Sequence, residues 1–354
     1  MPNFSNCTDT KSTISGKNLI SLLCRKIDEI LLSLIPPGTK CALLDFPNHS
    51  NFGDSAIWLG EIAWLRQHDI KVVYISELKT CSFDHLARSL GSGGVILLSG
   101  GGNLGDLYSN HQRLREAVIT AFPKHRIVQL PQSIWFEKAE NLSRTKAVFS
   151  RHPDLILLVR DKRSLEIARN DFKVPTYLCP DMAFLLGSLA RPSPADSEIL
   201  WLLRKDEESL SATFMGSSEG RCVDWADGAM PIFLQITRFL FKQATEHPRK
   251  LGGLRRTLSW TYNLVAHQRV GIGCRLLSQG KVVITDRLHG HILSLLLGIP
   301  HIILDNNYGK VKSFYGTWTK DCTLAHWADS STEALKVARM IAIDQKEREF
   351  DAEG

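Results

Sequence analysis

The sequence has no uninterrupted apolar stretch of the roughly 20 residues that a membrane-spanning helix needs. Its most apolar stretch, 292–304, is broken by Gly298, Pro300 and His301. The N-terminal segment 1–17 is polar and has no apolar core of the kind found in signal peptides. We therefore expect a polar tail over 1–17, no membrane span and a cytoplasmic location.

Metal-binding and nucleic-acid-binding patterns are also missing. The eight cysteines are scattered, with no C-x-x-C pair and no Cys/His cluster at metal-ligand spacing, which is typical of reduced, mostly buried thiols. Lys and Arg number 43 against 37 Asp and Glu, and no basic block is present. The sequence thus predicts no metal, no cofactor and no nucleic-acid partner, while its net charge of +6 suits an anionic substrate.

What is present indicates a packed protein of two domains. The 354 residues exceed one ordinary core, and 44% are hydrophobic and 23% charged, near the globular average. Apolar residues recur at helical spacing over 19–35, before Pro36-Pro37-Gly38 ends the pattern. We expect this amphipathic helix to pack on the adjacent domain, and peripheral membrane association stays an open alternative.

Short apolar runs then alternate with helical patterns, which is typical of a parallel sheet covered on both faces. The expected strands are 41–46, 72–75, 95–98, 127–130 and 155–159, and the expected helices are 55–67, 112–121 and 162–169. They predict a Rossmann-like domain over 18–190. The segment 191–197 contains two prolines and little apolar content, so it is predicted to be a linker.

A second α/β domain is predicted over 198–354. Its expected strands are 199–203, 282–285 and 301–304, and its expected helices are 231–244, 254–278 (with a break in it left open) and 289–297. Ligands of open α/β sheets bind outside the carboxyl ends of the strands. The fold class is therefore α/β, with two Rossmann-like domains facing across a cleft that contains the site.

A glycine-rich segment, SGGGNLGD, follows the strand 95–98 and matches G-x-G-x-x-G at Gly100, Gly102 and Gly105. A dinucleotide site also needs an acidic residue after the next strand. Here the strand 127–130 is followed by Pro-Gln-Ser, which argues against a dinucleotide ligand. Two alternatives remain: a turn whose bare backbone lets a ligand approach closely, or a tight strand-to-helix turn without a ligand.

Polar residues cluster after two other strands. His49, Asn51 and Asp54 follow the strand 41–46, where they could bind a hydroxyl-rich ligand or cap the next helix. Asp286, Arg287, His289 and His291 follow the strand 282–285 within a few positions. Arg offers a planar fork for a carboxylate or phosphate, and His offers a proton donor that titrates near neutrality. This grouping favours function over a purely structural histidine.

The residues of seven segments, in order along the chain, resemble the polysaccharide pyruvyl transferase family. These segments are NFGDSAIWLG, GGGNLGDLY, LPQSIWF, RDKRS, CPDMAF, LLRKDEE and TDRLHGHILSLLLGIPHIILDNNYGK. The resemblance implies a fold similar to the type-B glycosyltransferases. It also implies phosphoenolpyruvate as donor and, as product, a cyclic pyruvate ketal on a hexose of an exopolysaccharide or cell-wall glycan.

The implied substrate then suggests roles for individual residues. Arg204, Arg287 and Lys310 would neutralise the donor, with His289 also in the donor site. The predicted catalytic residues are His289 as the acid that protonates the methylene carbon, Arg287, and Asp286, which either orients an Arg or caps the helix. His49 and His291 are the next candidates for the acid.

The acceptor, a sugar or a lipid-linked oligosaccharide, is expected on the side of the first domain. Its predicted contacts are Asn51, Asp54, Gly101, Gly102, Asn103 and Gln132. Two other functions stay open: a nucleotide-sugar-dependent glycosyltransferase of the same architecture, and a glycan-binding protein without catalysis. The combination of Arg204, Arg287 and His289 argues against the second, because binding alone needs no imidazole acid.

Overall fold

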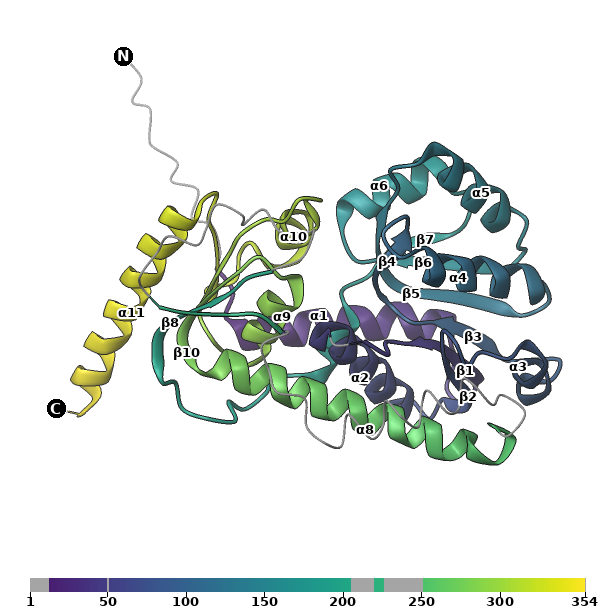
Figure 1. The fold of residues 1–354 in the computed structure, drawn as a ribbon, viewed down its shortest axis with the longest axis horizontal. Coiled ribbons are helices and arrows are strands. Elements are labelled where there is room, and N and C mark those ends of the chain that lie inside the picture. Colours follow the sequence, from purple (N-terminus) through teal and green to yellow (C-terminus); the bar gives the residue numbers. More distant parts are fainter. Residues whose placement is uncertain (1–12, 50, 205–219, 226–250, 354) are drawn as a thin grey trace, which may run out of the picture.

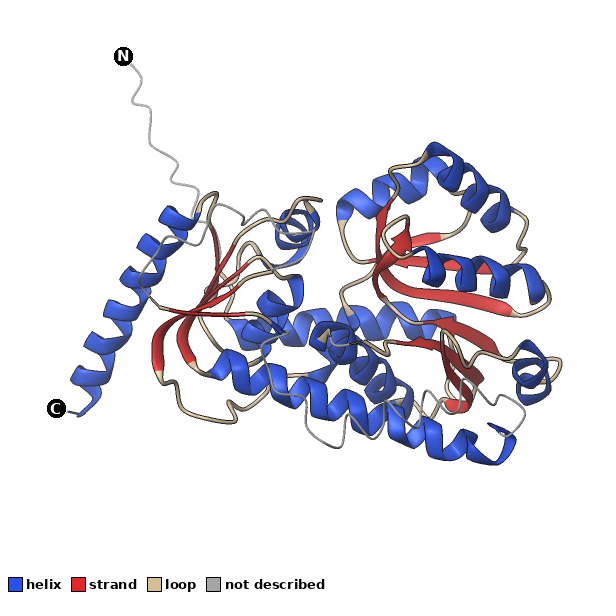
Figure 2. Cartoon of the chain, viewed as in Figure 1, coloured by secondary structure: helices blue, strands red, loops and turns tan. Residues whose placement is uncertain are grey.

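The computed structural model describes residues 13–49, 51–204, 220–225 and 251–353. Within these ranges the chain forms two parallel β-sheets covered by helices, so the predicted α/β class is confirmed (Figures 1 and 2). The helix expected over 231–244 lies outside the described residues. No described helix is long and apolar enough to cross a membrane.

The first sheet has the strand order β2-β1-β3-β5-β6-β7, with β4 paired to the far end of β5. Its strands are β1 (Lys40–Phe46), β2 (Lys71–Glu77), β3 (Val95–Leu98), β4 (Gly101–Gly105), β5 (Arg126–Trp135), β6 (Leu155–Val159) and β7 (Thr176–Leu178). Its connecting helices are α2 (Phe52–Gln67), α3 (Phe83–Leu90), α4 (Ser109–Ala121), α5 (Ala139–Ser150) and α6 (Lys162–Asp171), and η1 (Met182–Leu186) follows β7. All five expected strands and three expected helices are confirmed.

The second sheet has the order β12-β11-β10-β8-β9. Its strands are β8 (Ser197–Leu202), β9 (Arg221–Val223), β10 (Gly280–Thr285), β11 (His301–Ile303) and β12 (Ala325–Trp327). The helices of this part are α8 (Leu251–Ser278), α9 (Leu288–Leu296), α10 (Lys310–Phe314), the π-helical turn η5 (Tyr315–Thr319) and α11 (Ser331–Glu353). The expected helix 254–278 is thus one continuous helix without a break.

Two long helices connect the halves of the chain. Helix α1 (Gly16–Leu34) buries one apolar face against η1 and α9, as its amphipathic pattern predicts. Helix α8 follows β8 and β9 in sequence but packs against α2 (Figure 1). Its Tyr262 ring stacks on Phe46 of β1 at 4.5 Å, and Trp58 of α2 donates to Asn263 Oδ1 at 2.9 Å. The domain bounds 18–190 and 198–354 stay a prediction, and contacts cross between them.

The strand orders place a topological switch point in each sheet. In the first, β2 lies on one side of β1 and β3 on the other; in the second, β9 and β10 lie on either side of β8. Loops that leave such a point diverge to opposite faces of the sheet, and ligands commonly bind there. The loops concerned contain the polar residues singled out after β1, β3, β8 and β10.

Candidate active site

His289 lies in the first turn of α9, just past the carboxyl end of β10, and is buried. Its Nε2 has no hydrogen-bond partner among the described residues, and the nearest charged atom is Asp181 Oδ2 at 3.5 Å. The first turn of α2 packs flat against the ring, because a Cβ at Gly53 would stand only 2.2 Å from His289 Cγ. Only glycine at position 53 leaves the imidazole this space.

Asp181 connects His289 to a buried arginine of the first sheet. Arg160, directly after β6, places NH1 2.6 Å from Asp181 Oδ2 and donates from Nε to Ser133 Oγ at 3.0 Å. Burial would raise the pKa of Asp181, but the charges of His289 and Arg160 hold it well below its usual range. The carboxylate therefore stays ionised beside the imidazole.

The glycine-rich segment is not the predicted turn into a helix. It forms strand β4, which pairs with β5, and the next helix begins only at Ser109. A Cβ at Gly102 would lie 3.0 Å from Arg160 NH2 and 3.8 Å from Lys310 Nζ. The backbone at Gly102 thus faces two cations, one from each half of the chain. Such a surface without a side chain lets an anion lie close to the backbone.

Asn51, rather than Asp54, caps α2. Its Oδ1 accepts from Gly53 N at 3.1 Å and its Nδ2 donates to Asp54 Oδ2 at 2.8 Å. Asp54 also lies 3.5 Å from His49 Nε2, and its Oδ1 is 3.5 Å from the position of a Cβ at Gly101. The structure therefore brings Asn51, Asp54 and the glycine strand together, as the sequence predicted.

The side-chain amide of Gln132 hydrogen-bonds to Asn103 at both of its ends. Gln132 is fully buried, accepts from Asn103 N at 3.0 Å and donates to Asn103 Oδ1 at 2.9 Å. Arg115 of α4 donates to the same oxygen at 2.6 Å. Gln132 therefore supports β4 from the interior of the protein, whereas the half-buried Asn103 lies closer to the surface. Their predicted contact with an acceptor stays a prediction.

Asp286 contacts the backbone of one of the two predicted donor arginines, and its predicted roles at the site stay predictions. It accepts from the backbone N–H of Arg204 at 3.0 Å and so joins the ends of the neighbouring strands β8 and β10. Burial raises the pKa of Asp286 to about 6, despite the nearby positive charges of Arg287 and Arg204. The guanidinium of Arg287 instead pairs with Asp224, NH2 to Oδ1, at 2.5 Å. Arg204 and Arg287 thus both follow carboxyl ends of adjacent strands, and their joint contact with one anion stays a prediction.

His291 lies deeper than His289. It is fully buried, its Nδ1 lies 2.6 Å from Nε2 of His301, and its Nε2 lies 2.9 Å from Thr319 Oγ1. Burial and the neighbouring His301 lower the pKa of His291 well below the ordinary value. A neutral, fully paired ring does not suit the acid. Burial lowers the pKa of His49 as well, but the neighbouring carboxylate of Asp54 raises it, so His49 is the better of the two reserve candidates.

The comparisons with known proteins agree with this arrangement. The family model described as "Polysaccharide pyruvyl transferase" matches residues 51–308, which contain the glycine strand, Arg160, Asp181 and His289. The chain belongs to the polysaccharide pyruvyl transferase family. It is 32% identical over 304 residues to "Pyruvyl transferase 1" of Schizosaccharomyces pombe, covering 80% of this chain and 71% of that one.

One further relative of this pyruvyl transferase family member and one solved structure extend the comparison. EpsO of Bacillus subtilis, whose name also contains the words pyruvyl transferase, is 33% identical over 297 residues, which cover 81% of this chain and 88% of EpsO. The crystal structure of an uncharacterized protein from Klebsiella pneumoniae matches with a TM-score of 0.56 at 18% identity, covering 87% of this chain and 99% of the other. That likeness concerns the fold alone.

Sequence reasoning missed Arg160 and Asp181 as site residues of this family member. A signal was present for Arg160, because it directly follows the apolar run 155–159 at the carboxyl end of a predicted strand. Asp181 lies in CPDMAF, one of the segments that carry the family resemblance, but it follows the short, partly exposed β7, which no pattern predicted, so no role was assigned to it. Among the described residues, no group of three or more His, Cys, Asp and Glu side chains could hold a metal ion.

Proposed function

We propose that the protein transfers an enolpyruvyl group from phosphoenolpyruvate to two hydroxyls of a hexose, forming a cyclic pyruvate ketal. One observation carries the proposal: Arg160 and Lys310 both reach the bare backbone of Gly102, while Arg160 and His289 share the oxygen of Asp181. Two cations thus lie beside the bare backbone of Gly102, and Asp181 links one of them to a proton donor. A small, highly charged anion that must be protonated matches these three features.

The cations account for donor binding. Arg160 uses NH1 on Asp181 and Nε on Ser133, and no described residue accepts a hydrogen bond from its NH2. It can therefore donate to a phosphate or carboxylate beside Gly102, together with the Lys310 ammonium. Fixed positive charges in a buried site stabilise negative charge that develops on a leaving phosphate. Arg204 and Arg287, past the ends of β8 and β10, complete the proposed donor side.

His289 is the proposed acid. The ionised carboxylate of Asp181 lies 3.5 Å from its Nε2, and the first turn of α2 holds the ring in one place at Gly53. Its proton passes to the methylene carbon of the donor, which leaves an oxocarbenium-like centre at the adjacent carbon. One sugar hydroxyl attacks that centre, phosphate leaves, and the second hydroxyl closes the ketal. General acid catalysis of this kind is worth about 100- to 10,000-fold.

The names of the relatives bear on the identity of the donor more than on that of the acceptor. Both relatives described above have the words pyruvyl transferase in their names, which is consistent with phosphoenolpyruvate chemistry. A sugar of an exopolysaccharide or cell-wall glycan, free or lipid-linked, is the proposed acceptor. The proposal includes action in the cytoplasm, no metal or cofactor, and two Rossmann-like domains facing across a cleft, similar to type-B glycosyltransferases.

The test is an incubation with phosphoenolpyruvate and a panel of hexose acceptors, with release of inorganic phosphate as the measurement. Acceptor-dependent phosphate release by the wild-type protein, and a mass gain of the acceptor equal to one pyruvate ketal, are expected. A matched set with nucleotide sugars covers the rival function. Release of nucleotide, with no phosphate from phosphoenolpyruvate, would identify a glycosyltransferase instead.

A further inference from the structure

A second buried acid–histidine pair lies near the glycine strand, outside the donor residues. Asp45 is at the end of β1, where its pairing with β2 is irregular, and its backbone has a φ of 73°. Few residues other than glycine adopt this left-handed conformation, and such strain persists mainly at functional sites. Asp45 is also buried, so its carboxylate is held in one place by the surrounding structure.

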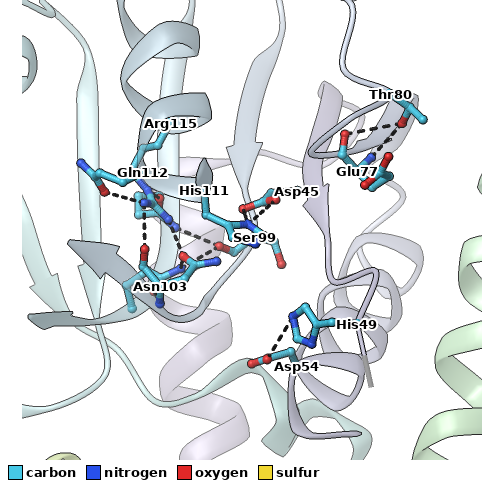
Figure 3. Close-up of polar contacts among 12 residues, drawn as sticks. Asp45, His49, Asp54, Glu77, Thr80, Ser99, Asn103, His111, Gln112 and Arg115 are labelled. Carbon is cyan, nitrogen blue, oxygen red and sulfur yellow. Dashed lines mark hydrogen bonds and ion pairs between the residues drawn. The ribbon is translucent and has the colours of Figure 1, made fainter. Parts of the chain in front are cut away.

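His111 of α4 completes the pair. Its Nδ1 lies 2.8 and 2.9 Å from the two oxygens of Asp45, with the ring pointing toward the carboxylate (Figure 3). Among the described residues, no hydrogen-bond partner occupies its Nε2, and the side chain is 18% exposed. An imidazole that donates from Nδ1 to a carboxylate presents the lone pair of Nε2, which is the arrangement of a general base.

Charges around the pair favour this role. Burial lowers the pKa of His111, but the hydrogen bond and negative charge of Asp45 outweigh it, so the pKa is raised above its usual value. Asp54 of α2 raises it further, whereas Arg115, one turn along α4, lowers it. His49, in the segment between β1 and α2, faces the same group, since His111 lowers the pKa of His49.

The pair is also connected to the glycine strand. Arg115, four residues after His111 on α4, donates to Asn103 Oδ1 of β4 at 2.6 Å, next to Gly102. Asp54, which interacts electrostatically with His111, lies against Gly101. His111 is therefore on the side of Asp54 and Asn103, two residues that are expected to bind the acceptor (Figure 3).

We propose that His111, held by Asp45, is the base that takes the proton from the attacking hydroxyl of the sugar. The inference rests on the proposed function. His289 gives one proton to the methylene carbon, and the sugar oxygen bonds to the adjacent carbon while its proton passes to His111. The carbon–oxygen bond to phosphate then breaks, the second hydroxyl bonds in its place, and its proton leaves with phosphate. His111 returns its proton to solvent, and His289 takes one up.

The experiment compares phosphate release by the wild type, His111→Gln, His111→Ala and Asp45→Asn over a range of pH. His111→Gln should lower kcat by about 100- to 10,000-fold. In the wild type, activity should fall as pH drops through the raised pKa of His111, because the base must be neutral. This fall in activity on the acid side of the pH profile, the acid limb, should vanish in His111→Gln and move to lower pH in Asp45→Asn. Asn tolerates the left-handed backbone of position 45, so Asp45→Asn should fold.

Added imidazole separates catalysis from a merely structural contact. It should restore activity to His111→Ala in proportion to its concentration, since a free base can occupy the vacated space. His267→Gln, on the exposed face of α8, is the matched control and should behave as the wild type with or without imidazole. If His111→Gln keeps its acid limb, or imidazole gives no rescue, His111 is not the base. A wild type that releases no phosphate from phosphoenolpyruvate would instead refute the proposed function and, with it, this role.

Discussion

Gly53→Ala tests the position of His289 without touching its chemistry. The new Cβ would lie 2.2 Å from His289 Cγ, 2.3 Å from Nδ1 and 2.4 Å from Cβ, whereas ordinary contacts begin at 3.4 Å. The ring must therefore move by about 3.4 − 2.2 = 1.2 Å. A misplacement of about 1 Å at a reacting group can cost about 100-fold in rate. We expect kcat for phosphate release to fall by roughly that factor.

Stability should change much less than activity. Alanine in place of glycine stabilises a helix by up to about 1 kcal/mol, while overpacking costs about 1–3 kcal/mol, so the two effects partly cancel. Gly271→Ala in α8 is the matched control, because the nearest atom to its Cβ is 3.7 Å away. Gly60→Ala is the opposite case, since its Cβ would lie 1.9 Å from the backbone oxygen of Met182.

The assays are steady-state phosphate release and thermal unfolding, measured on all three alanine variants. Gly53→Ala should lose activity with a smaller loss of Tm than Gly60→Ala, Gly271→Ala should keep both, and Gly60→Ala should lose the most Tm. Wild-type kcat in Gly53→Ala would show that the fixed place of the imidazole is irrelevant to turnover. The proposed acid would then have to be sought elsewhere, with His49 as the next candidate.

Three further changes have definite expected outcomes. Gly102→Ala should raise the KM for phosphoenolpyruvate about 10-fold at unchanged Tm, because its Cβ would crowd Arg160 NH2 at 3.0 Å; an unchanged KM would exclude the donor from this surface. Burial raises the pKa of Glu61 from 4.5 to about 8, so the folded protein holds a proton that the unfolded chain releases. Stability should therefore fall as pH rises from 4.5 to 8, and Glu61→Gln should flatten this slope in denaturant unfolding at several pH values. Asp224→Asn leaves the charge of the buried Arg287 without its carboxylate and should destabilise the protein by about 3 kcal/mol in urea unfolding; a loss below 1 kcal/mol would show that the pair is not important for stability.

Strands with continuous apolar runs could be predicted, whereas short or polar strands could not. β3 and β6 are entirely buried and apolar, so the pattern alone revealed them. β4 consists of Gly-Gly-Asn-Leu-Gly and exists because the long β5 offers its far end for pairing. That tertiary contact leaves no local signal, so the segment was interpreted as a turn.

Part of the candidate site could be predicted for the same reason. Lys310 lies near Gly102, Asp54 near Gly101 and His289 against Gly53, because each lies at or near the carboxyl end of a strand, while their roles stay predictions. Asp286 has a partner that local reasoning does not offer, the backbone N–H of Arg204, which is 82 positions away in sequence. Such a partner is decided by the pairing of β8 with β10 and cannot be deduced from neighbouring residues.

The path of α8 has a consequence for how the chain folds. Its Tyr262 and Asn263 contact Phe46 and Trp58, two aromatic residues that belong to the first sheet and its helix α2. A fragment that ended before this helix would expose these aromatic surfaces to water, and exposed apolar patches promote aggregation. Ribosomal synthesis must therefore proceed at least through residue 278 before the first sheet can complete its own core.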